Sequence, residues 1–405
     1  MSYKISSFPV FKLLTVAHIQ PGFAFKSDQF LDDDSQIPLV KGENLQQGYV
    51  DWKSSKYWRK DEYDDYEKYH LKQGDVVIAM DRPWVTAGLK WSYMKKHDPK
   101  SLLVQRVARL RAKTGLKQSY LRVLISSNYF ASYVQPIVTG VNVPHISGKQ
   151  IGDFKAPIPD EKVQQKIAAI LAAYDDLIEN NKRRIALLEK MAEEIYREWF
   201  VRFRFPGYQS AEFEKGIPKG WDQIKFGDFC TLKRGYDLPD SAVEPGDYPV
   251  IASTSVKTYH KTFKAKSPVI TTGRSGSLGV VLMTHKNAWP LNTTLYVKDL
   301  RGNSPFLVYY TLKGMRLEQF NAGAGVPSLN RNHLSALKIY RPSELIQKKF
   351  DELIKPIFRE IHVLEEVVEN STQTKNFLLP RLISGKLSVE ELAIQFPPSM
   401  QDDAA

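Results

Sequence analysis

The fold is decided by residues 159–200, which read PDEKVQQKIAAILAAYDDLIENNKRRIALLEKMAEEIYREWF. Apolar residues recur there every three or four positions, which is the period of an amphipathic helix. Pro159 and Asp160 are typical of a helix start, and neither glycine nor a further proline occurs before Pro206. A helix of about 45 residues would be roughly 65 Å long, which exceeds the needs of one small core. The pattern therefore predicts a long helix that packs against another long helix.

The chain resembles itself at an offset of 183 residues, and this repeat supplies a second helix. The corresponding residues are 143–144 with 326–327, Pro159 with Pro342, Gln164 with Gln347, and 170–171 with 353–354. Weaker echoes lie upstream, where residues 38–40 resemble 249–251 and residues 77–82 resemble 269–274. Because this period is far longer than a solenoid unit, it indicates a duplicated domain. We expect a kink or a break in the second helix at Pro356.

Short apolar runs and turn signals precede each helix. Residues 75–80 and 268–271 are examples, and such runs predict the strands of α/β (α+β) domains. Glycine and proline gather at 206–220, which is typical of a linker. The sequence therefore predicts a first mixed domain at 1–158, a helix at 159–205, a linker at 206–220, a second mixed domain at 221–341, a helix at 342–390 and a disordered tail at 391–405.

Composition excludes several classes of protein. The chain has 405 residues, a formal net charge of +12 and 42% hydrophobic residues, which suffice for real cores. No run of about 18 apolar residues occurs, so no membrane helix is expected. Lys12 and His18 interrupt any apolar segment of a signal peptide. Cys230 is the only cysteine, so no intramolecular disulfide is possible, and we expect a reducing, cytoplasmic location.

The positive charge lies in two blocks, one in each predicted domain. Residues 1–155 carry 23 basic and 15 acidic side chains, and residues 221–340 carry 15 basic and 8 acidic ones. Cations with few acids nearby neutralise phosphates, so we expect a nucleic-acid-binding surface in each domain rather than two surfaces that are basic by chance. The candidate DNA-binding residues are Arg82, Trp84, Lys90, Lys95, Lys96, Arg106, His260, Lys261, Lys264, Lys266, Arg274, Ser275, Ser277, Asn292 and Arg331.

No motif for catalysis stands out in the sequence. A P-loop, an Asn-Pro-Pro-aromatic run and a paired metal spacing among the 8 histidines are all missing, so we expect neither an enzyme nor a metal site. Residues 273–279, GRSGSLG, could let the backbone approach a phosphate. Two interpretations of this segment stay open, a DNA-contacting loop and a plain tight turn. Asn181 and Arg184 either fix the register of paired helices or reach solvent at the edge of the apolar stripe.

Several stretches resemble the specificity subunits of Type I restriction–modification enzymes. Residues 378–387, LLPRLISGKL, resemble the C-terminal signature of that family, and residues 157–181 resemble its central helix. Residues 272–279 are similar to a loop that is common in its target-recognition domains. The resemblance covers nearly the whole chain. One departure is residues 80–84, MDRPW, which stand in the first domain in place of the glycine-rich loop of the second.

The resemblance implies a non-catalytic subunit with two homologous target-recognition domains of mixed α/β structure. Two long, antiparallel-paired, coiled-coil-like helices would separate them in a pseudo-twofold arrangement. Each domain would read one half of a bipartite, asymmetric site in double-stranded DNA. The helices would set the spacing and dock two modification (methyltransferase) subunits, and we expect this docking at Ile167, Ile170, Tyr174, Ile178, Leu188, Ile195, Leu353, Ile357, Ile361 and Leu364.

Cofactors are expected on the partners and not on this chain. The resemblance implies S-adenosylmethionine on the modification subunit, and ATP and Mg on a restriction subunit that can join the complex. The alternative interpretation is a sequence-nonspecific, two-domain DNA-binding protein without a methyltransferase partner. That alternative explains the charge but not why two homologous halves carry loops of different size.

Overall fold

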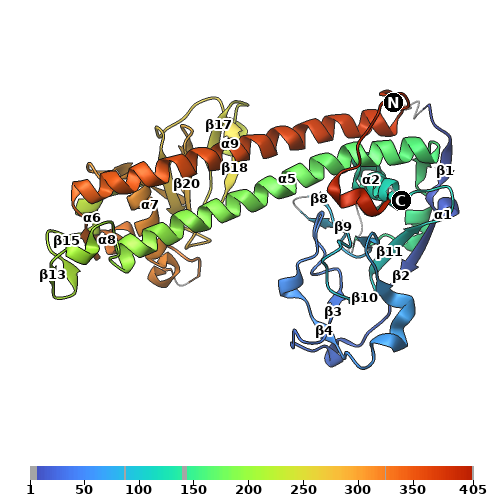
Figure 1. Ribbon diagram of the computed structural model, residues 1–405, viewed down its shortest axis with the longest axis horizontal. Helices are drawn as coiled ribbons and strands as arrows, with labels where there is room; N and C mark the ends of the chain where they lie inside the picture. Colours follow the sequence, from blue (N-terminus) through green and yellow to red (C-terminus); the bar gives the residue numbers. More distant parts are fainter. Residues whose placement is uncertain (1–6, 86–87, 139–143, 324, 404–405) are drawn as a thin grey trace. The chain divides into compact units, whose positions relative to one another are not determined.

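The computed structural model describes residues 7–85, 88–138, 144–323 and 325–403, and the chain divides into two compact units (Figure 1). Unit 1 comprises Met1–Lys182 and Glu366–Ala405, and unit 2 comprises Arg183–Glu365. Val143 of the repeat and the last two residues of the predicted tail lie outside the described residues. Each unit therefore holds one mixed domain together with a part of both long helices.

Two long helices form where the apolar period predicts them (Figure 1, green and red). Helix α5 extends over Glu161–Tyr196 and continues into a π-helical turn, and α9 extends over Glu344–Ile383. Ion pairs join them within each unit, Asp175 with Lys375 in unit 1 and Arg184 with Glu360 in unit 2. Because rising residue numbers on α5 meet falling numbers on α9, the helices are antiparallel, as expected.

Of the kink or break expected at Pro356, the break does not occur, because α9 passes through this residue as one helix of 40 residues. A proline in a helix leaves the carbonyl four residues earlier without its hydrogen bond. Here both Pro356 and Glu352 are exposed, so that carbonyl can bond to water. Their neighbours Ile354 and Ile357 are buried, at 0% and 8% exposure, and hold this turn against the core of unit 2.

Unit 1 contains two four-stranded sheets. One has the order β2-β11-β6-β9 with antiparallel neighbours, and the other has the order β4-β3-β10-β5 with β3 and β10 parallel. The strands of these sheets are β2 (Ala17–Pro21), β3 (Ile37–Val40), β4 (Tyr57–Trp58), β5 (His70–Leu71), β6 (Val76–Ala79), β9 (Trp91–Tyr93), β10 (Ser101–Leu103) and β11 (Val107–Ala112). Around them lie α1 (Leu13–Val16), α2 (Gln118–Ser126), α3 (Asn128–Val138), α4 (Gly148–Gly152), the pair β1 (Val10–Lys12) with β12 (Lys155–Pro157), and the hairpin β7 (Trp84–Val85) with β8 (Gly88–Leu89).

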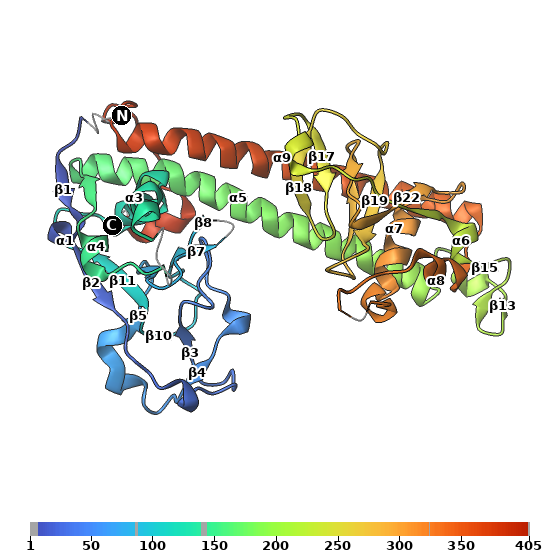
Figure 2. The ribbon, with the colours of Figure 1, turned by 180° about the vertical axis from the view of Figure 1, so that it is seen from behind.

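Unit 2 repeats this plan with one four-stranded and one three-stranded sheet, seen from behind in Figure 2. Their orders are β16-β22-β19-β20, antiparallel throughout, and β18-β17-β21, with β17 and β21 parallel. The strands are β16 (Thr231–Arg234), β17 (Tyr248–Ile251), β18 (Val256–His260), β19 (Val269–Gly273), β20 (Val281–Thr284), β21 (Trp289–Pro290) and β22 (Thr294–Asp299). Beside them lie α6 (Phe226–Phe229), α7 (Pro305–Gly314), α8 (Arg331–Ala336), and the pairs β13 (Phe213–Glu214) with β14 (Ile217–Pro218) and β15 (Asp222–Lys225) with β23 (Lys338–Arg341).

Gln164 and Gln347 show that the repeat reflects a shared structural role. Both side chains are buried near the start of a long helix, at 0% and 7% exposure. Gln164 donates to the carbonyl of Pro159 and accepts from the backbone N–H of Lys117, and Gln347 bonds in the same way to Pro342 and Ser304. Each glutamine therefore satisfies the backbone at the junction between a long helix and its mixed domain, which explains why it recurs at an offset of 183.

The prediction of a disordered tail is wrong for the part of it that packs on unit 1. Met400 is 3% exposed and belongs to the same core as Phe154 and Ile167, and Phe396 packs partly against this core. Burial of a methionine side chain contributes about 1.5–3 kcal/mol, which with the partial burial of Phe396 offsets part of the cost of ordering this segment. The sequence signal was masked because prolines and acidic residues surround these apolar side chains.

Candidate nucleic-acid interface

In unit 1, eight backbone hydrogen bonds hold together the loops that carry Arg82 and Arg106. They run from the N–H of Gly22 to Val107, of Phe23 to Leu103, of Val104 to Val40, of Gln105 to Phe23, of Val107 to Val104, of Met80 to Arg106, of Arg82 to Pro144 and of Ile146 to Met80, with N···O distances of 2.7–3.3 Å. They connect the end of β6 with the turn that precedes β11 and with the segment that precedes α4. The loops at this end of the sheets are thus mutually braced.

Unit 2 contains eight backbone hydrogen bonds in the same arrangement, formed by the corresponding residues. They run from the N–H of Gly235 to Thr294, of Tyr236 to Pro290, of Leu291 to Ile251, of Asn292 to Tyr236, of Thr294 to Leu291, of Arg274 to Thr293, of Gly276 to Pro327 and of Leu329 to Arg274, at 2.8–3.1 Å. We call this shared set of bonds the recognition frame. It places the glycine-rich loop of unit 2 and residues 80–82 of unit 1 in corresponding positions.

The recognition frame corrects one alignment made from the sequence. Arg82 donates to Pro144 as Gly276 donates to Pro327, so Arg82 corresponds to Gly276. The residue that corresponds to Arg274 is Met80, whose side chain is only 8% exposed. The alignment of Arg82 with Arg274 was therefore wrong by two positions. It paired two arginines, whereas the backbone pairs an arginine with a glycine.

Residues 273–279 form a tight turn that other segments brace. A Cβ on Gly273 would lie 2.0 Å from the carbonyl oxygen of Ser277, so only glycine fits there. Gly276 has a φ of +85°, a conformation that favours glycine. The hydroxyl of Ser253 donates to the carbonyl of Ser275 at 2.9 Å. The turn thus holds Arg274, Ser275 and Ser277 on a fixed backbone. That these three residues contact DNA remains a prediction.

In unit 1 the corresponding loop carries charge. Arg82 and Arg106 have φ values of 42° and 68°, in the left-handed region that residues with a side chain seldom adopt. Asp81 forms an ion pair with Arg106 at 3.1 Å and a hydrogen bond with His145. Both arginines are exposed, the Arg106 side chain to 69%. Unit 1 therefore presents two guanidinium groups from backbone that is held in a strained conformation.

A cluster of aromatic and basic side chains lies beside the frame in unit 2, and the sequence predicted only part of it. Lys264 Nζ lies 4.8 Å from the centroid of the Trp289 ring and 5.9 Å from that of Tyr236. The hydroxyls of Tyr236 and Tyr296 are 3.0 Å apart, and Lys233 donates to Tyr236 at 3.2 Å. This hydrogen bond to Tyr296 and the nearby ammonium groups lower the pKa of Tyr236, whereas burial raises the pKa of Tyr296.

The signal that could have found Tyr236 is a Gly-aromatic echo. Gly22 and Phe23 correspond to Gly235 and Tyr236 in the recognition frame. This two-residue echo lies at an offset of 213, whereas the repeat in the long helices lies at 183. Because loop lengths differ between the halves, a search at a constant offset does not detect it.

Several predicted DNA-binding residues contact their own chain instead. His260 is 5% exposed and packs edge-to-face on Trp289, so it supports the fold, and its prediction as a DNA contact is corrected. Lys90 donates to the carbonyl of Gly42 at 2.8 Å, and Lys95 pairs with Glu179 on α5 at 3.0 Å. Lys261 pairs with Glu244 and stays 53% exposed. Lys95 and Lys261 are partly neutralised and Lys90 is held by a carbonyl, so these lysines contribute less to a phosphate-binding surface than their number indicates.

The remaining candidates are surface residues outside the central turn of the frame. Trp84 lies in the hairpin of β7 and β8 and is 37% exposed. Lys96, Lys266 and Arg331 are exposed, and Arg331 begins α8, two residues after Leu329 of the frame. The structure therefore brings Arg82 and Arg106 together in unit 1, and Arg274, Ser275 and Asn292 together in unit 2.

The apolar stripe of the long helices serves the chain's own cores. Ile167, Ile357, Ile361 and Leu364 are buried, at 0%, 8%, 6% and 4% exposure. Ile170, Leu188 and Ile195 pack partly against the two main cores, and Tyr174 and Ile178 are half-buried. The expectation that these residues dock partner subunits is therefore corrected for the buried ones, and of the ten only Leu353 is exposed, at 44%. A periodic stripe does not reveal whether its partner lies in the same chain.

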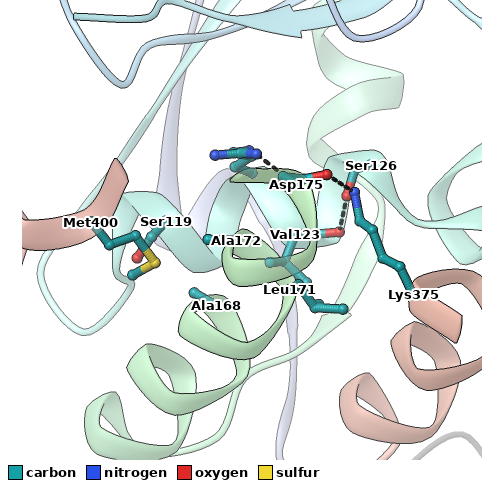
Figure 3. A pocket seen from close by; sticks show the side chains of 10 residues that line it. Ser119, Val123, Ser126, Ala168, Leu171, Ala172, Asp175, Lys375 and Met400 are labelled. Carbon is teal, nitrogen blue, oxygen red and sulfur yellow. Dashed lines mark hydrogen bonds and ion pairs between the residues drawn. The ribbon is translucent and has the colours of Figure 1, made fainter. Parts of the chain in front are cut away.

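One acidic side chain on α5 joins two other helices of unit 1 (Figure 3). Asp175 accepts from Arg122 of α2 at 2.6 Å and also pairs with Lys375 of α9. The Arg122 guanidinium lies 3.7 Å from the centroid of the Tyr93 ring. All three charged side chains are 17–29% exposed, so solvent screens these ion pairs only in part. Asp175 therefore fastens the mixed domain of unit 1 to the helix pair.

The described residues contain no group of three or more His, Cys, Asp or Glu side chains that could hold a metal ion. Burial raises the pKa of the Cys230 thiol to about 12, so this cysteine is not an activated nucleophile. In the part of the chain that the structure covers, no helix has both the length and the apolar character that crossing a membrane requires.

Comparison with known proteins gives consistent results. A family profile described as "Type I restriction modification DNA specificity domain" matches residues 6–190 and 218–369. The chain is 26% identical to the Type I restriction enzyme MjaIX specificity subunit of Methanocaldococcus jannaschii, covering 69% of this chain and 71% of that protein. It is 33% identical to the HindI specificity subunit of Haemophilus influenzae, covering 66% and 77%. The S subunit of a Type I restriction–modification system from M. genitalium shares the fold, with a TM-score of 0.58 at 12% identity over 95% of this chain and 98% of that one.

Proposed function

Because the chain belongs to the family of Type I restriction–modification DNA specificity domains, we propose that it is the DNA-recognition subunit of such a complex. The domain at 1–158 reads one half of a bipartite, asymmetric site in double-stranded DNA, and the domain at 221–341 reads the other half. One observation carries this proposal. The same recognition frame occurs in both units and presents different side chains at corresponding positions, Arg82 against Gly276 and Arg106 against Thr293. Two related frames with different side chains suit two different half-sites.

The helices at 159–205 and 342–390 set the spacing of the half-sites and dock two modification subunits. The cores bury part of the apolar stripe, but other apolar side chains of the two helices are exposed and available for docking. They are Leu177, Leu187, Met191, Leu353, Val363 and Phe377, at 42–67% exposure. The chain supplies no catalytic group. S-adenosylmethionine binds to the modification subunit, and ATP and Mg bind to a restriction subunit where one joins.

Reconstitution with a modification subunit tests this function. We expect the chain alone to neither methylate nor cleave DNA, and the reconstituted complex to methylate DNA at a bipartite sequence when S-adenosylmethionine is added. Exchange of residues 221–341 for those of a relative should change one half-site and leave the other unchanged. Methyl transfer by the chain alone, or a hybrid in which both half-sites change, would contradict the proposal.

A further inference from the structure

We infer that Gln105 and Asn292 are the adenine-reading residues of the two domains, an inference that rests on the proposed function. They occupy the same place in the recognition frame. The backbone N–H of Gln105 donates to Phe23 at 2.7 Å, and that of Asn292 donates to Tyr236 at 3.0 Å. Two unequal domains thus place a side-chain amide at one common position, although the arginines around it differ.

Backbone contacts fix the turn that carries each amide. Gln105 and Asn292 are each the second residue of a four-residue turn, closed by bonds from Val107 to Val104 at 3.3 Å and from Thr294 to Leu291 at 2.9 Å. A glycine packs on each turn, because a Cβ on Gly22 would lie 2.2 Å from the Val104 oxygen and one on Gly235 would lie 2.1 Å from the Leu291 oxygen. The turn therefore keeps its shape without help from the side chain that it presents.

Cationic side chains flank both amides. Arg106 follows Gln105 directly and is exposed, and Arg274 donates to the carbonyl oxygen of Asn292 at 3.4 Å. Basic side chains hold DNA through its phosphates, whereas the side chains between them reach the edges of bases. Each amide therefore lies beside a cation that can hold the DNA backbone, which places the amide for base contact.

The Asn292 side chain is oriented by its neighbour. Its Nδ2 donates one hydrogen to the carboxylate of Asp237. An amide nitrogen has a second hydrogen, and the amide oxygen is an acceptor. A bidentate contact with a base uses the amide oxygen and the hydrogen on the same side, and the bond to Asp237 requires only the other hydrogen. Gln105 is exposed and reaches one methylene further, so the corresponding base in its half-site can lie slightly further from the frame.

A paired donor and acceptor select adenine among the bases. In the major groove adenine offers the N6 amino group as a donor and N7 as an acceptor, and the amide of Asn or Gln bonds to both. Guanine offers two acceptors at the same edge and leaves the amide oxygen without a donor. Each half-site should therefore contain an adenine that one of these amides reads.

Selection from a library of DNA duplexes with a randomised core tests the inference. The probe is the full chain reconstituted with its modification subunit, as wild type and as Gln105→Ala and Asn292→Ala. We expect each variant to lose the adenine preference at one position of one half-site, Gln105→Ala in one half and Asn292→Ala in the other. Affinity for the wild-type consensus should fall about tenfold. The matched controls are Gln29→Ala and Gln319→Ala, exposed amides outside the frame, which should change nothing.

A duplex with 7-deazaadenine at the identified position removes the N7 acceptor and gives a second readout. It should weaken the wild type about tenfold and leave the matching alanine variant unaffected. Gln105→Glu keeps the shape of the side chain but loses the amide donors, so it should also lose the adenine preference while its thermal midpoint is unchanged. A uniform loss of affinity across all sequences, or an unchanged consensus in both alanine variants, overturns the inference. A wild-type complex that selects no consensus instead overturns the proposed function.

Discussion

Arg82 has a positive φ, which is strained for an arginine, whereas its counterpart in the second domain, Gly276, adopts a positive φ without strain. The φ of Arg82 is 42°, where a Cβ costs roughly 1–2 kcal/mol. The hydrogen bond from Arg82 N–H to Pro144 at 2.7 Å helps to hold this conformation. Strain of this kind collects at functional sites, and we interpret it as the consequence of placing a guanidinium group where the frame favours glycine.

Replacement of Arg82 by glycine should separate stability from DNA binding. We expect Arg82→Gly to raise the free energy of unfolding by up to about 1 kcal/mol, because relief of strain outweighs the added freedom of the unfolded chain. DNA binding through the first half-site should weaken, and the dependence of affinity on salt should fall by about one unit if Arg82 contacts a phosphate. Urea unfolding and binding titrations at several salt concentrations measure the two effects.

Arg316→Gly is the matched control for this variant. Arg316 is also exposed and has a φ of 49°, but it lies outside the recognition frame, at the start of the short helix Leu317–Phe320. The same gain in stability is expected with no change in DNA binding. If both variants bind DNA like the wild type, Arg82 is not part of the interface.

At the residue scale, the sequence predicted the turn at 273–279 from its glycines but did not predict which residues of the first domain correspond to it. The glycines at 273, 276 and 279 predicted a turn around Arg274, and the structure contains that turn. The corresponding loop of the first domain has no glycine, so only the backbone hydrogen bonds reveal that Arg82 stands in the place of Gly276. Gln105 was missed for the same reason, because its turn carries no motif and its glycine partner, Gly22, is 83 residues away.

At the scale of elements, the long helices were predictable because their signal is local and periodic. A break at Pro356, one of the two outcomes predicted there, does not occur, since Ile354 and Ile357 anchor the turn while the residues Glu352 and Pro356 are exposed to solvent. The short strands gave weaker signals, because most have two to six residues and form sheets only through distant partners. Contacts between elements, such as that of Asp175 with Arg122 and Lys375, leave no trace in the sequence.

Removal of the Asp175 carboxylate should loosen the attachment of the first domain to the helices. We expect Asp175→Ala to lower the free energy of unfolding by about 2 kcal/mol, because Arg122 and Lys375 would be left half-buried without their common partner. Asp175→Asn should cost less, since an amide can still accept a hydrogen bond from Arg122. Chemical denaturation of the full chain measures both changes.

The exposed pair of Arg184 and Glu360 is the matched control for this ion pair. It also joins α5 to α9, but its side chains are 50% and 45% exposed. Glu360→Gln should therefore change stability by less than about 1 kcal/mol. Equal losses for Asp175→Ala and Glu360→Gln would show that Asp175 has no special role in attaching the domain.

At the scale of the whole molecule, the duplication and the mixed character of the repeated domains were visible in the sequence, but the strand order within them was not. The offset of 183 follows the helix starts, where Gln164 and Gln347 make the same bonds. Within the mixed domains the offset between corresponding residues falls from 211 to 194. It is 211 for residues 38–40 of β3, which correspond to residues of β17, and 194 for Ala79 of β6, which corresponds to Gly273 of β19, as the pairing of these strands within their own sheets shows. Loops of different length therefore hide a common backbone from any comparison at a constant offset.

The chain passes between the two units within the two long helices. We therefore propose that the length of these helices sets the distance between the two half-sites on DNA. Helix α5 leaves unit 1 after Lys182, and α9 leaves unit 2 after Glu365. Insertion of four residues into both helices at these points adds about one turn, or roughly 6 Å, to each. Because four residues rotate a helix by about 400°, the apolar stripe nearly keeps its face and the pairing should survive.

The four-residue variant should methylate a site whose unread gap is longer by about two base pairs, at roughly 3.4 Å for each. The bases read in each half-site should be unchanged, because the recognition frames are untouched. Insertion of two residues in each helix rotates the stripe by about 200° and should abolish pairing and methylation. Mapping of methylated positions in cells that also carry the modification subunit measures both outcomes. If the four-residue variant is active with its original gap, the helices do not set the spacing, and the modification subunits must position the two domains on DNA instead.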